Sequence, residues 1–404
     1  MIVALRIPAG GPSVGKCPSP VLGMHFAPWG RFEDAGMNRL TTSARCALAC
    51  VSAAFAGDVA LAQDTCGESW LVADTDSPGS VAIAYDEFRR ETLTQSGGTL
   101  WAWNGEAWAV RWTEPLLDGV DAMAYDRNRR VTWIFGGGGY DDRLWKWDGS
   151  ALTLVANDTI GGRAYVAMAY DWKRDRLVVH GGQSAAQWLY SSWGEYDPSS
   201  NQWTTWDNGP VGRLYAHKMV YDPVRERCVM HGGFYFFNRP ETWTWDGATW
   251  SLATTSGPAR YVANMAWDSI RQQVVFHGGT TCCGEVEYAS TWTWRGGAWS
   301  ECSLQGPARG YTNMAFDVHR DRFVLPGGIG PTPSGRQWIP HTNELVMGCS
   351  SDVDGDGVVS GSDLGRVLNG WGSGVTDAAA DIDRNGVIDG ADLGAVLAGW
   401  GPCG

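Results

Sequence analysis

The feature that most constrains what this chain can fold into is a short pattern that recurs six times. Each copy has an aromatic residue followed by Asp, an Arg three residues after that Asp, and an apolar run that ends in Gly-Gly. The six Asp are Asp86, Asp126, Asp171, Asp222, Asp268 and Asp317, and successive positions differ by 40, 45, 51, 46 and 49 residues. A repeat of this period indicates one supersecondary unit used several times, because each unit needs its neighbours to bury its apolar face.

One copy of the pattern predicts four antiparallel strands. Around Asp171, residues 167–169 form the first strand, residues 171–174 a polar turn, and residues 177–180 the return strand. The Asp of such a turn can accept a hydrogen bond from the backbone two residues on. After Gly-Gly, four copies carry a Trp-x-Trp strand whose two indoles share one face. A short turn and a further Trp mark the fourth strand, and these closing residues are Trp108, Trp203, Trp250 and Trp299.

A four-stranded sheet of about 45 residues cannot bury both faces alone, but radial stacking into a β-propeller buries them. Six copies predict six blades over residues 63–347; seven blades is the alternative, although a seventh copy of the pattern that ends in Gly-Gly is missing. The last copy has a third strand near residues 342–347 and no closing Trp. Trp70 stands before the first copy, where a closing residue is expected. We therefore expect the N-terminal strand to complete the last blade and close the ring.

These motifs resemble the kelch family: a double Gly, then an aromatic strand, then a closing Trp, over about residues 66–347. The resemblance implies a propeller like the central domain of galactose oxidase. The predicted fold is thus an all-β six-bladed propeller, followed by a small α-helical calcium-binding domain over residues 348–404.

Composition agrees with a turn-rich, aromatic β protein. The chain of 404 residues has 54 Gly and 24 Trp, and only 19% of its residues are charged. This excludes a coiled coil, which would be rich in Ala, Glu, Lys and Leu. The net charge of −13 argues against nucleic-acid binding, which rests on clustered Lys and Arg. No apolar run reaches the roughly 18 residues of a membrane span.

Residues 1–62 are predicted to be an upstream extension and a secretory signal peptide. Met37 is the expected start, Arg39 and Arg45 give a positive region, residues 46–56 are small and apolar, and cleavage is expected after Ala62. The alternative is an apolar first helix of the domain. Either translation starts later than Met1 or the leader is unusually long. The sequence thus predicts a secreted or cell-surface protein.

Two twelve-residue patterns near the C-terminus predict two Ca²⁺ sites. Their oxygen-bearing residues fall at the positions that EF-hand loops use, with Gly at position 6 for the sharp turn. The predicted ligands are Asp352, Asp354, Asp356, Val358 (backbone carbonyl), Ser360 and Asp363, and, 29 residues later, Asp381, Asp383, Asn385, Val387 (backbone carbonyl), Asp389 and Asp392. Residues 349–404 hold nine Asp, two Arg and no Glu or Lys, a net charge of −7. Because these carboxylates repel without metal, we expect folding of this segment to depend on calcium.

Each loop is followed by a helix pattern with an apolar face, Leu364, Val367, Leu368 and Trp371 in the first half. This duplicated loop-helix unit, with Asp at loop position 12, resembles a type I dockerin. The resemblance implies attachment to a cohesin-like protein on an extracellular scaffold, often beside polysaccharide-degrading enzymes. Residues 361–362 and 390–391 depart from the Ser-Thr pair usual at loop positions 10 and 11, so another surface protein is an open alternative.

The propeller offers two sets of candidate ligand-binding residues. Arg163, Arg213, Arg260 and Arg309 lie eight or nine residues before the repeated Asp, where inner strands begin. With the nearby Tyr165, Tyr215, Tyr261 and Tyr311, they suit an anionic ligand or a sugar; the alternative is that each Arg braces its own loop. Three His precede the double Gly in successive copies, His180, His231 and His277. They are either metal ligands or polar fillers at strand ends.

Seven Cys remain after the predicted leader, an odd number that leaves at least one unpaired or paired between chains. Cys349 with Cys403 is the first candidate disulfide. Cys302 could pair with Cys282 or Cys283, and Cys228 reads as a buried thiol.

Together these patterns favour a binding or adaptor protein whose propeller holds a glycan or protein partner while the C-terminal domain anchors it. The alternative is a carbohydrate-active enzyme, either a copper oxidase resembling galactose oxidase or a sugar isomerase. An oxidase of that kind needs Tyr, His and Cys together, and the sequence places only Tyr215 and His217 near one another. No Ser/His/Asp set or carboxylate pair is singled out by spacing.

Overall fold

The computed structural model describes residues 69–402 except 80, 138, 158, 282–285, 348–350, 354–357, 373–379 and 383–386. All of these belong to Asp64–Gly404, one of the two compact units into which the chain divides. The predicted signal peptide therefore lies outside the described residues.

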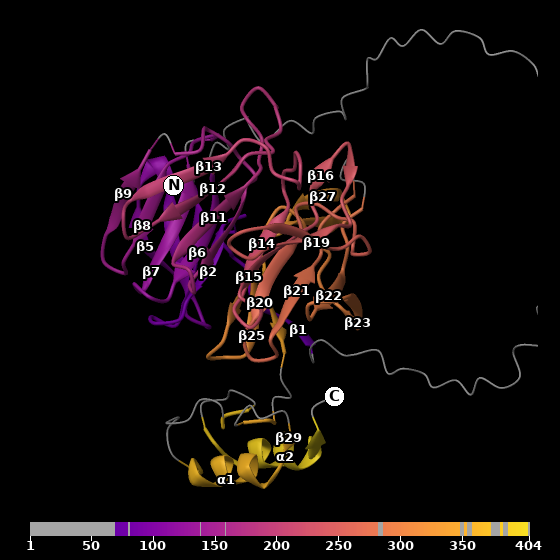
Figure 1. Cartoon of the computed structure of the whole chain (residues 1–404). Coiled ribbons are helices and arrows are strands. Elements are labelled where there is room, and N and C mark those ends of the chain that lie inside the picture. The colour runs from indigo at the N-terminus through magenta and orange to yellow at the C-terminus, as the bar shows by residue number, and fades with distance from the viewer. Residues whose placement is uncertain are drawn as a thin grey trace, which may run out of the picture. The chain divides into compact units, whose positions relative to one another are not determined.

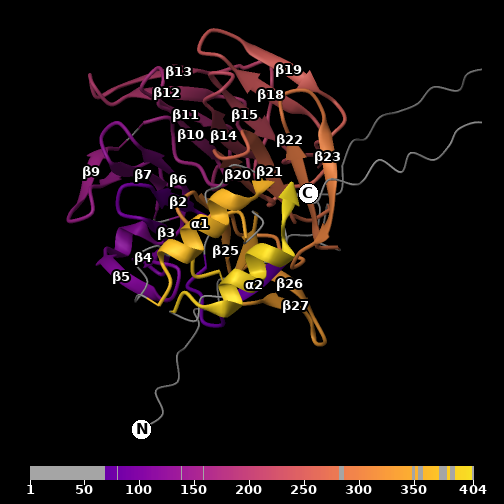
Figure 2. The same cartoon turned by 90° about the horizontal axis from the view of Figure 1, so that it is seen from below.

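The described part of residues 69–347 forms six four-stranded antiparallel sheets, the blades of a propeller (Figure 1). Seen from below, the blades follow one another around a common centre (Figure 2). Blade 1 comprises β2 (Ile83–Asp86), β3 (Glu91–Ser96), β4 (Thr99–Trp103) and β5 (Trp108–Thr113), and blade 2 comprises β6 (Val120–Asp126), β7 (Val131–Gly136), β8 (Leu144–Trp147) and β9 (Leu152–Ala156). Blade 3 comprises β10 (Ala167–Asp171), β11 (Arg176–His180), β12 (Trp193–Asp197) and β13 (Gln202–Trp206), and blade 4 comprises β14 (Lys218–Asp222), β15 (Arg227–His231), β18 (Thr242–Trp245) and β19 (Trp250–Thr254). Blade 5 comprises β20 (Asn264–Asp268), β21 (Gln273–His277), β22 (Ser290–Trp294) and β23 (Trp299–Gln305), and blade 6 comprises β24 (Ala315–Asp317), β25 (Arg322–Pro326), β28 (Thr342–Val346) and β1 (Ser69–Asp74).

Among the described residues, three short elements lie in the loops between these strands. They are the hairpins β16 (Phe234–Tyr235) with β17 (Phe237–Asn238) and β26 (Ile329–Thr332) with β27 (Gly335–Trp338), and the 3-10 turn η1 (Pro115–Leu117).

No helix among the described residues is long and apolar enough to cross a membrane.

The ring closes as predicted, because β1 is the outermost strand of blade 6. Trp70 pairs with Leu345, and Ser69 with Val346. The junction with blade 1 is a polar contact at Glu344, which is only 2% exposed. Trp103 Nε1 donates to Glu344 Oε1 over 2.9 Å, and Arg320 Nη1 donates to the same oxygen over 2.7 Å. The first blade and the last are thereby joined through a buried, charge-assisted network.

The repeated Asp forms a buried turn anchor between the two inner strands of every blade. All six Asp side chains are at most 3% exposed. Asp171 Oδ1 accepts the N–H of Lys173 over 3.1 Å and of Arg174 over 3.0 Å, while Oδ2 pairs with Arg174 Nε over 2.7 Å. The Asp therefore satisfies backbone donors that a buried turn would otherwise leave without partners.

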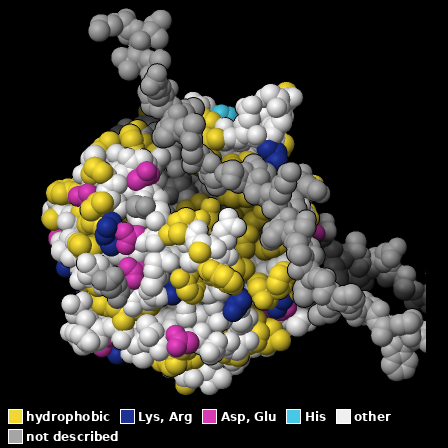
Figure 3. All heavy atoms as spheres, turned by 90° about the horizontal axis from the view of Figure 1, so that it is seen from above, with side chains coloured by type: hydrophobic (Ala, Val, Ile, Leu, Met, Phe, Trp, Pro, Cys, Tyr) yellow, Lys and Arg dark blue, Asp and Glu magenta, His cyan; other side chains and the backbone are white. Residues whose placement is uncertain are grey.

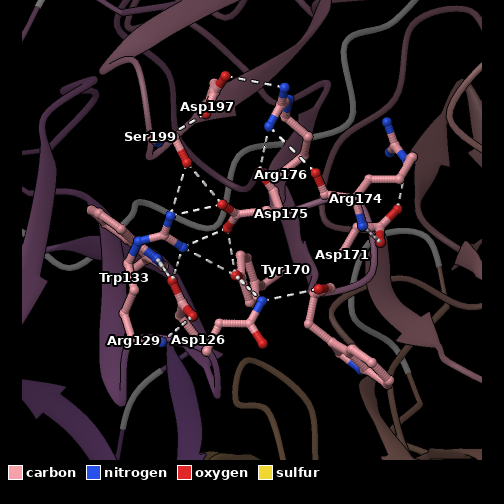
Figure 4. A network of polar contacts seen from close by, with 12 residues as sticks. Asp126, Arg129, Trp133, Tyr170, Asp171, Arg174, Asp175, Arg176, Asp197 and Ser199 are labelled. Carbon is pink, nitrogen blue, oxygen red and sulfur yellow. Dashed lines mark hydrogen bonds and ion pairs between the residues drawn. The ribbon is translucent and has the colours of Figure 1, made fainter.

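The repeated Arg does more than the sequence predicted, because in several blades it reaches beyond its own turn. Figure 4 shows Arg129 of blade 2 bonded both to Asp126 and to Asp175, which belongs to blade 3. Arg129 Nη2 lies 2.7 Å from Asp175 Oδ2, and the Tyr170 hydroxyl donates to Asp175 Oδ1 over 2.7 Å. Arg271 makes the same kind of pair with Asp321 between blades 5 and 6. The available signal was an Asp directly after the repeated Arg in blades 3 and 6.

Most of the Trp-x-Trp residues are packing residues. The second Trp of each pair is buried, at most 5% exposed: Trp103, Trp147, Trp245 and Trp294. Trp103 lies directly opposite the closing Trp108 across the two outer strands, and Trp245 lies opposite Trp250 in the same way. Aromatic pairs of this kind add roughly 0.5–1.5 kcal/mol beyond the area that they bury.

The described residues of the C-terminal segment form two helices and a short strand pair with a core of their own. They are β29 (Val358–Val359), α1 (Gly361–Asn369), α2 (Gly390–Ala398) and β30 (Gly401–Pro402). The core residues are Val353, Val359, Val367, Ala380, Ile388 and Val396. Both helices begin with a capping box, Ser360 with Asp363 and Asp389 with Asp392. The described residues of the duplicated pattern thus form two similar halves, each with one capped helix.

Candidate functional site

The inner strands of the six blades surround a central channel that encloses about 240 Å³. Each inner strand contacts the inner strands of the two adjacent blades, including β2 with β24. At one end the channel is lined by the residue after each repeated Asp: Glu87, Arg127, Trp172, Pro223, Ser269 and Val318. Toward the other end, where the inner strands begin, it is lined by Asp121, Lys218 and Asn313.

Beyond this second end the four predicted tyrosines form one aromatic cluster. Tyr165, Tyr215, Tyr261 and Tyr311 come from four successive blades, and the ring centroids of neighbours lie 6.0, 6.2 and 6.4 Å apart. The space-filling view of this face shows hydrophobic side chains around a hollow at its middle (Figure 3). The sequence predicts these four tyrosines only as neighbours of the four candidate Arg, and the fold brings their rings close to one another.

The backbone of the same loops links the blades to one another. Ala216 N–H donates to Tyr165 O, Val262 N–H to Ala216 O, and Tyr311 N–H to Val262 O, over 3.0 to 3.1 Å. All four residues have positive φ, between 46° and 59°. Non-glycine residues adopt this conformation at a cost of about 1–3 kcal/mol, which the surrounding structure must supply. Backbone hydrogen bonds therefore join successive blades at this end of the channel.

The four candidate Arg do not form one set. Arg163 is 2% exposed and donates to Gly181 O and Ser192 Oγ, both over 3.1 Å. Its guanidinium also stacks 4.0 Å from the Tyr190 ring centre. Arg260 repeats this arrangement in blade 5, with bonds to Gly278 O and Ser290 Oγ and a ring contact to Tyr288. These contacts correspond to the alternative in which each Arg braces its own blade.

The other two Arg lie in different surroundings. Arg309 is buried and donates to Ala308 O over 2.9 Å. Arg213 is exposed and lines a groove beside blade 3, together with Trp188 and Asp207. Ligand binding by the four Arg stays a prediction.

The three repeated His are buried, and each bridges its own blade to the next loop. His231 Nε2 lies 3.1 Å from Pro258 O, while Nδ1 lies 2.9 Å from Thr242 Oγ1, which also accepts from Trp299 Nε1 over 2.7 Å. His277 is placed in the same way between Pro307 O and Thr291 Oγ1. The part of the chain that the structure describes has no group of three or more His, Cys, Asp or Glu that could hold a metal ion.

His180 differs, because its partner is another imidazole. His180 Nδ1 lies 3.1 Å from His217 Nε2, and the outer nitrogens, His180 Nε2 and His217 Nδ1, have no hydrogen-bond partner among the described residues. Burial lowers the pKa of His180 to about 3, of His231 to about 3 and of His277 to about 4, and it holds the pKa of His217 well below its usual range. All four imidazoles are therefore neutral near pH 7.

We expect the free energy of unfolding to fall as pH drops from about 6.5 to 4.5. The unfolded chain protonates these imidazoles near pH 6.5, whereas the folded chain does not, so each contributes a slope of about 1.4 kcal/mol per pH unit. Asp121 acts in the opposite sense, because burial raises its pKa to about 7 and the folded state takes up that proton first. Denaturant unfolding at several pH values measures the slope. The variant His231→Gln should lower this slope by about 1.4 kcal/mol per pH unit, because one imidazole no longer takes up a proton on unfolding. An unchanged slope would contradict the assignment.

The polar residues in the channel were missed from sequence. Asp121 is 8% exposed; its Oδ1 accepts the Tyr165 N–H over 2.7 Å, and its Oδ2 has no partner in the part of the chain that the structure describes. Lys218 lines the same channel, and burial lowers its pKa to about 8. A signal was available, since each charge is an exception among the copies. Lys218 stands one residue before the Met that precedes the repeated Asp, where the other copies have Ala or Asn, and Asp121 stands two residues before it, where no other copy has a carboxylate.

Several predicted calcium ligands can be placed, and others cannot. Asp363 and Asp392 are fully buried at position 12 of each loop. Asp363 Oδ1 accepts the Val353 N–H over 2.7 Å and Oδ2 accepts the Ser360 N–H over 2.8 Å. Asp392 repeats both bonds with Ile382 and Asp389. Asp352, Val358, Asp381 and Val387 are also described, whereas Asp354, Asp356, Asp383 and Asn385 lie outside the described residues.

The placed carboxylates fit a hard cation. A carboxylate oxygen that accepts one N–H keeps a further lone pair for a metal ion, and burial of Asp363 and Asp392 fixes their direction. The oxygen-only donor chemistry is that of Ca²⁺. The calcium sites stay a prediction.

Only two of the Cys named in the predictions about pairing lie among the described residues. Cys228 is a free, buried thiol in β15. Cys302 is disulfide-bonded, but its two predicted partners, Cys282 and Cys283, lie outside the described residues, as do Cys349 and Cys403.

Comparison with known proteins supports the propeller fold but no more specific assignment. No family model matches the chain, and no curated protein matches it. Among solved structures, one titled "Structure of YjhT" is similar with a TM-score of 0.52 and 12% identity. The match covers 68% of this chain and 96% of that one. At this identity the likeness shows a shared propeller fold alone.

Proposed function

We propose that this chain is a secreted or cell-surface binding protein. Its propeller holds a glycan or protein partner, and its dockerin-like C-terminal segment binds two Ca²⁺ and attaches the protein to a cohesin-like or other surface protein. Such an arrangement suits polysaccharide-degrading machinery, in which non-catalytic modules position enzymes and substrates.

The observation that carries the proposal is a pair of apolar side chains exposed at equivalent places in both halves of the C-terminal segment. Leu368 and Leu397 are 52% and 56% exposed, and Trp371 and Trp400 are 47% and 53% exposed. The core of the segment is complete without them, since Val367 and Val396 are fully buried. Exposed apolar groups that are not needed for packing are typical of a surface that binds another protein.

The anchoring role predicts calcium-dependent capture of a partner through these four residues. Tagged full-length protein is incubated with a surface extract of its source cells in Ca²⁺ or in EDTA, and captured proteins are identified by mass spectrometry. A variant with Leu368→Ala, Trp371→Ala, Leu397→Ala and Trp400→Ala should lose the protein captured in Ca²⁺. A propeller variant, Leu252→Ala with Trp188→Ala, removes the same kinds of exposed side chain and should retain it. Capture that survives both EDTA and the four substitutions would refute the anchoring role.

One observation favours the enzyme alternative. Asp121 and Lys218 share a channel, and burial brings the pKa of the carboxyl to about 7 and that of the amine to about 8. Groups that titrate near neutral pH suit acid–base chemistry such as sugar isomerisation. A screen for isomer exchange and for copper-dependent peroxide release on sugars separates an enzyme from a binder.

A further inference from the structure

The end of the central channel at which the inner strands begin holds two ionisable side chains that have no partner among the described residues. Asp121 Oδ2 is buried and accepts no hydrogen bond from any residue that the structure describes. Lys218 makes no hydrogen bond or ion pair with any described residue, although it lines both the channel and a void of about 10 Å³ next to Asp121. Buried polar groups in native proteins are nearly always satisfied, so the described part of the protein lacks a donor for the carboxylate. The amine of Lys218, which is partly exposed, is free to bind a group inside the channel.

The two groups are held apart by the fold. Asp121 lies on β6 of blade 2, where the backbone of Tyr165 fixes its other oxygen over 2.7 Å. Lys218 begins β14 of blade 4, so blade 3 stands between their strands. Each group attracts the other electrostatically, but no ion pair joins them within 4.0 Å. A small group that both donates and accepts hydrogen bonds would satisfy both, and a hydroxyl is such a group.

The rest of the channel is apolar and wide enough for more than a water molecule. Its walls near these charges are formed by residues of the inner strands, among them Ala122, Ala167, Met168 and Met219. The channel volume is about 240 Å³, slightly below the roughly 300 Å³ at which the range of typical ligand pockets begins, so it suits a small ligand such as a single sugar ring. A pyranose ring has an apolar C–H face for such walls and hydroxyls for the charged end.

We propose that the channel binds the terminal residue of a neutral saccharide, with one sugar hydroxyl between Asp121 and Lys218. The saccharide enters from the end lined by Glu87, Arg127 and Trp172, because the tyrosine cluster lies beyond the opposite end. The proposal rests on the binding role of the propeller proposed above, and it names the ligand class and the site.

The test uses the full chain and a panel of free sugars: glucose, galactose, mannose, xylose, N-acetylglucosamine and cellobiose, with glucuronate as an acidic comparison. Binding is followed by saturation-transfer NMR and isothermal titration. Asp121→Asn and Lys218→Met should each weaken binding of the preferred neutral sugar by at least tenfold. The matched controls Asp118→Asn and Lys146→Met make the same chemical changes outside the channel and should bind as the natural protein does. Melting curves establish that all variants are folded, and Lys218→Gln serves as a second variant if Lys218→Met is not.

The outcomes separate this proposal from the proposed function. Tenfold losses confined to the two channel variants support it. Sugar binding that is equal in all variants overturns the channel assignment but leaves the propeller a binding module. Failure of every neutral sugar to bind, or preference for glucuronate, overturns the ligand class, while the calcium-dependent capture experiment still decides the anchoring role.

Discussion

A chain that lacks residues 1–76 should lose the cooperative unfolding of the propeller, whereas one that lacks only residues 1–62 should melt like the full-length protein. The longer deletion removes β1, the strand that completes blade 6. The shorter one removes only the predicted leader and extension.

The effect should be large because β1 closes a ring. Without it, β28 becomes an exposed edge, and the buried contact of Glu344 with Trp103 of blade 1 opens to water. Folded proteins of this kind have only about 5–15 kcal/mol of net stability. Loss of a whole strand and its ladder removes on the order of 5 kcal/mol, which corresponds to a fall of about 8 °C in Tm for a propeller of roughly 280 residues.

Calorimetry of both truncated proteins measures this prediction. A synthetic peptide of residues 66–76, added in trans, should restore part of the lost transition, since the strand pairs with a preformed edge. Equal melting temperatures for the two truncations would contradict closure by β1.

Calcium removal should unfold the C-terminal segment while the propeller stays folded. Nine Asp and two Arg give residues 349–404 a net charge of −7, and without a cation the carboxylates repel one another. The segment buries only a small core of six residues among those described, so it has little apolar stabilisation to offset that repulsion. Metal binding and folding should therefore be coupled.

Hydrogen exchange followed by mass spectrometry measures the exchange rates of the amides in α1 and α2 separately from those in the blades. EDTA should speed exchange of both helices by at least 100-fold, and titration calorimetry should give two Ca²⁺ per chain. Asp352→Ala with Asp381→Ala should abolish both effects of calcium. Asp377→Ala is the control, because it removes an Asp outside both twelve-residue patterns. Helices that exchange equally slowly in EDTA would show that the loops are not calcium sites.

The blade architecture could be predicted because its determinants are local. The bonds of Asp171 go to residues two and three positions later, and the indoles of Trp103 and Trp108 meet across one short turn. Spacing along the chain encodes such contacts directly. Even the closure of the ring followed from counting, since Trp70 supplied the closing residue that the last copy lacks.

Contacts between blades were beyond this reasoning. The pair of Arg129 with Asp175 joins blades 2 and 3, and His180 meets His217 of the next loop. Neither pair has a fixed sequence spacing, because loops of different length separate the copies. The four candidate Arg show the same limit. They share one spacing in the sequence, but Arg163 is buried and bonded within its own blade, whereas Arg213 is exposed in a groove.

The sequence by itself thus determined the repeat, the number of blades and the closing strand, because these depend on period and on neighbours in the chain. Only the tertiary structure decided which residues face the axis. Asp121 and Lys218 look like isolated charges in two inner strands until the ring places both at one end of a single channel. Closure converts equivalent positions in separate repeats into neighbours in space, and that geometry produces the candidate binding site.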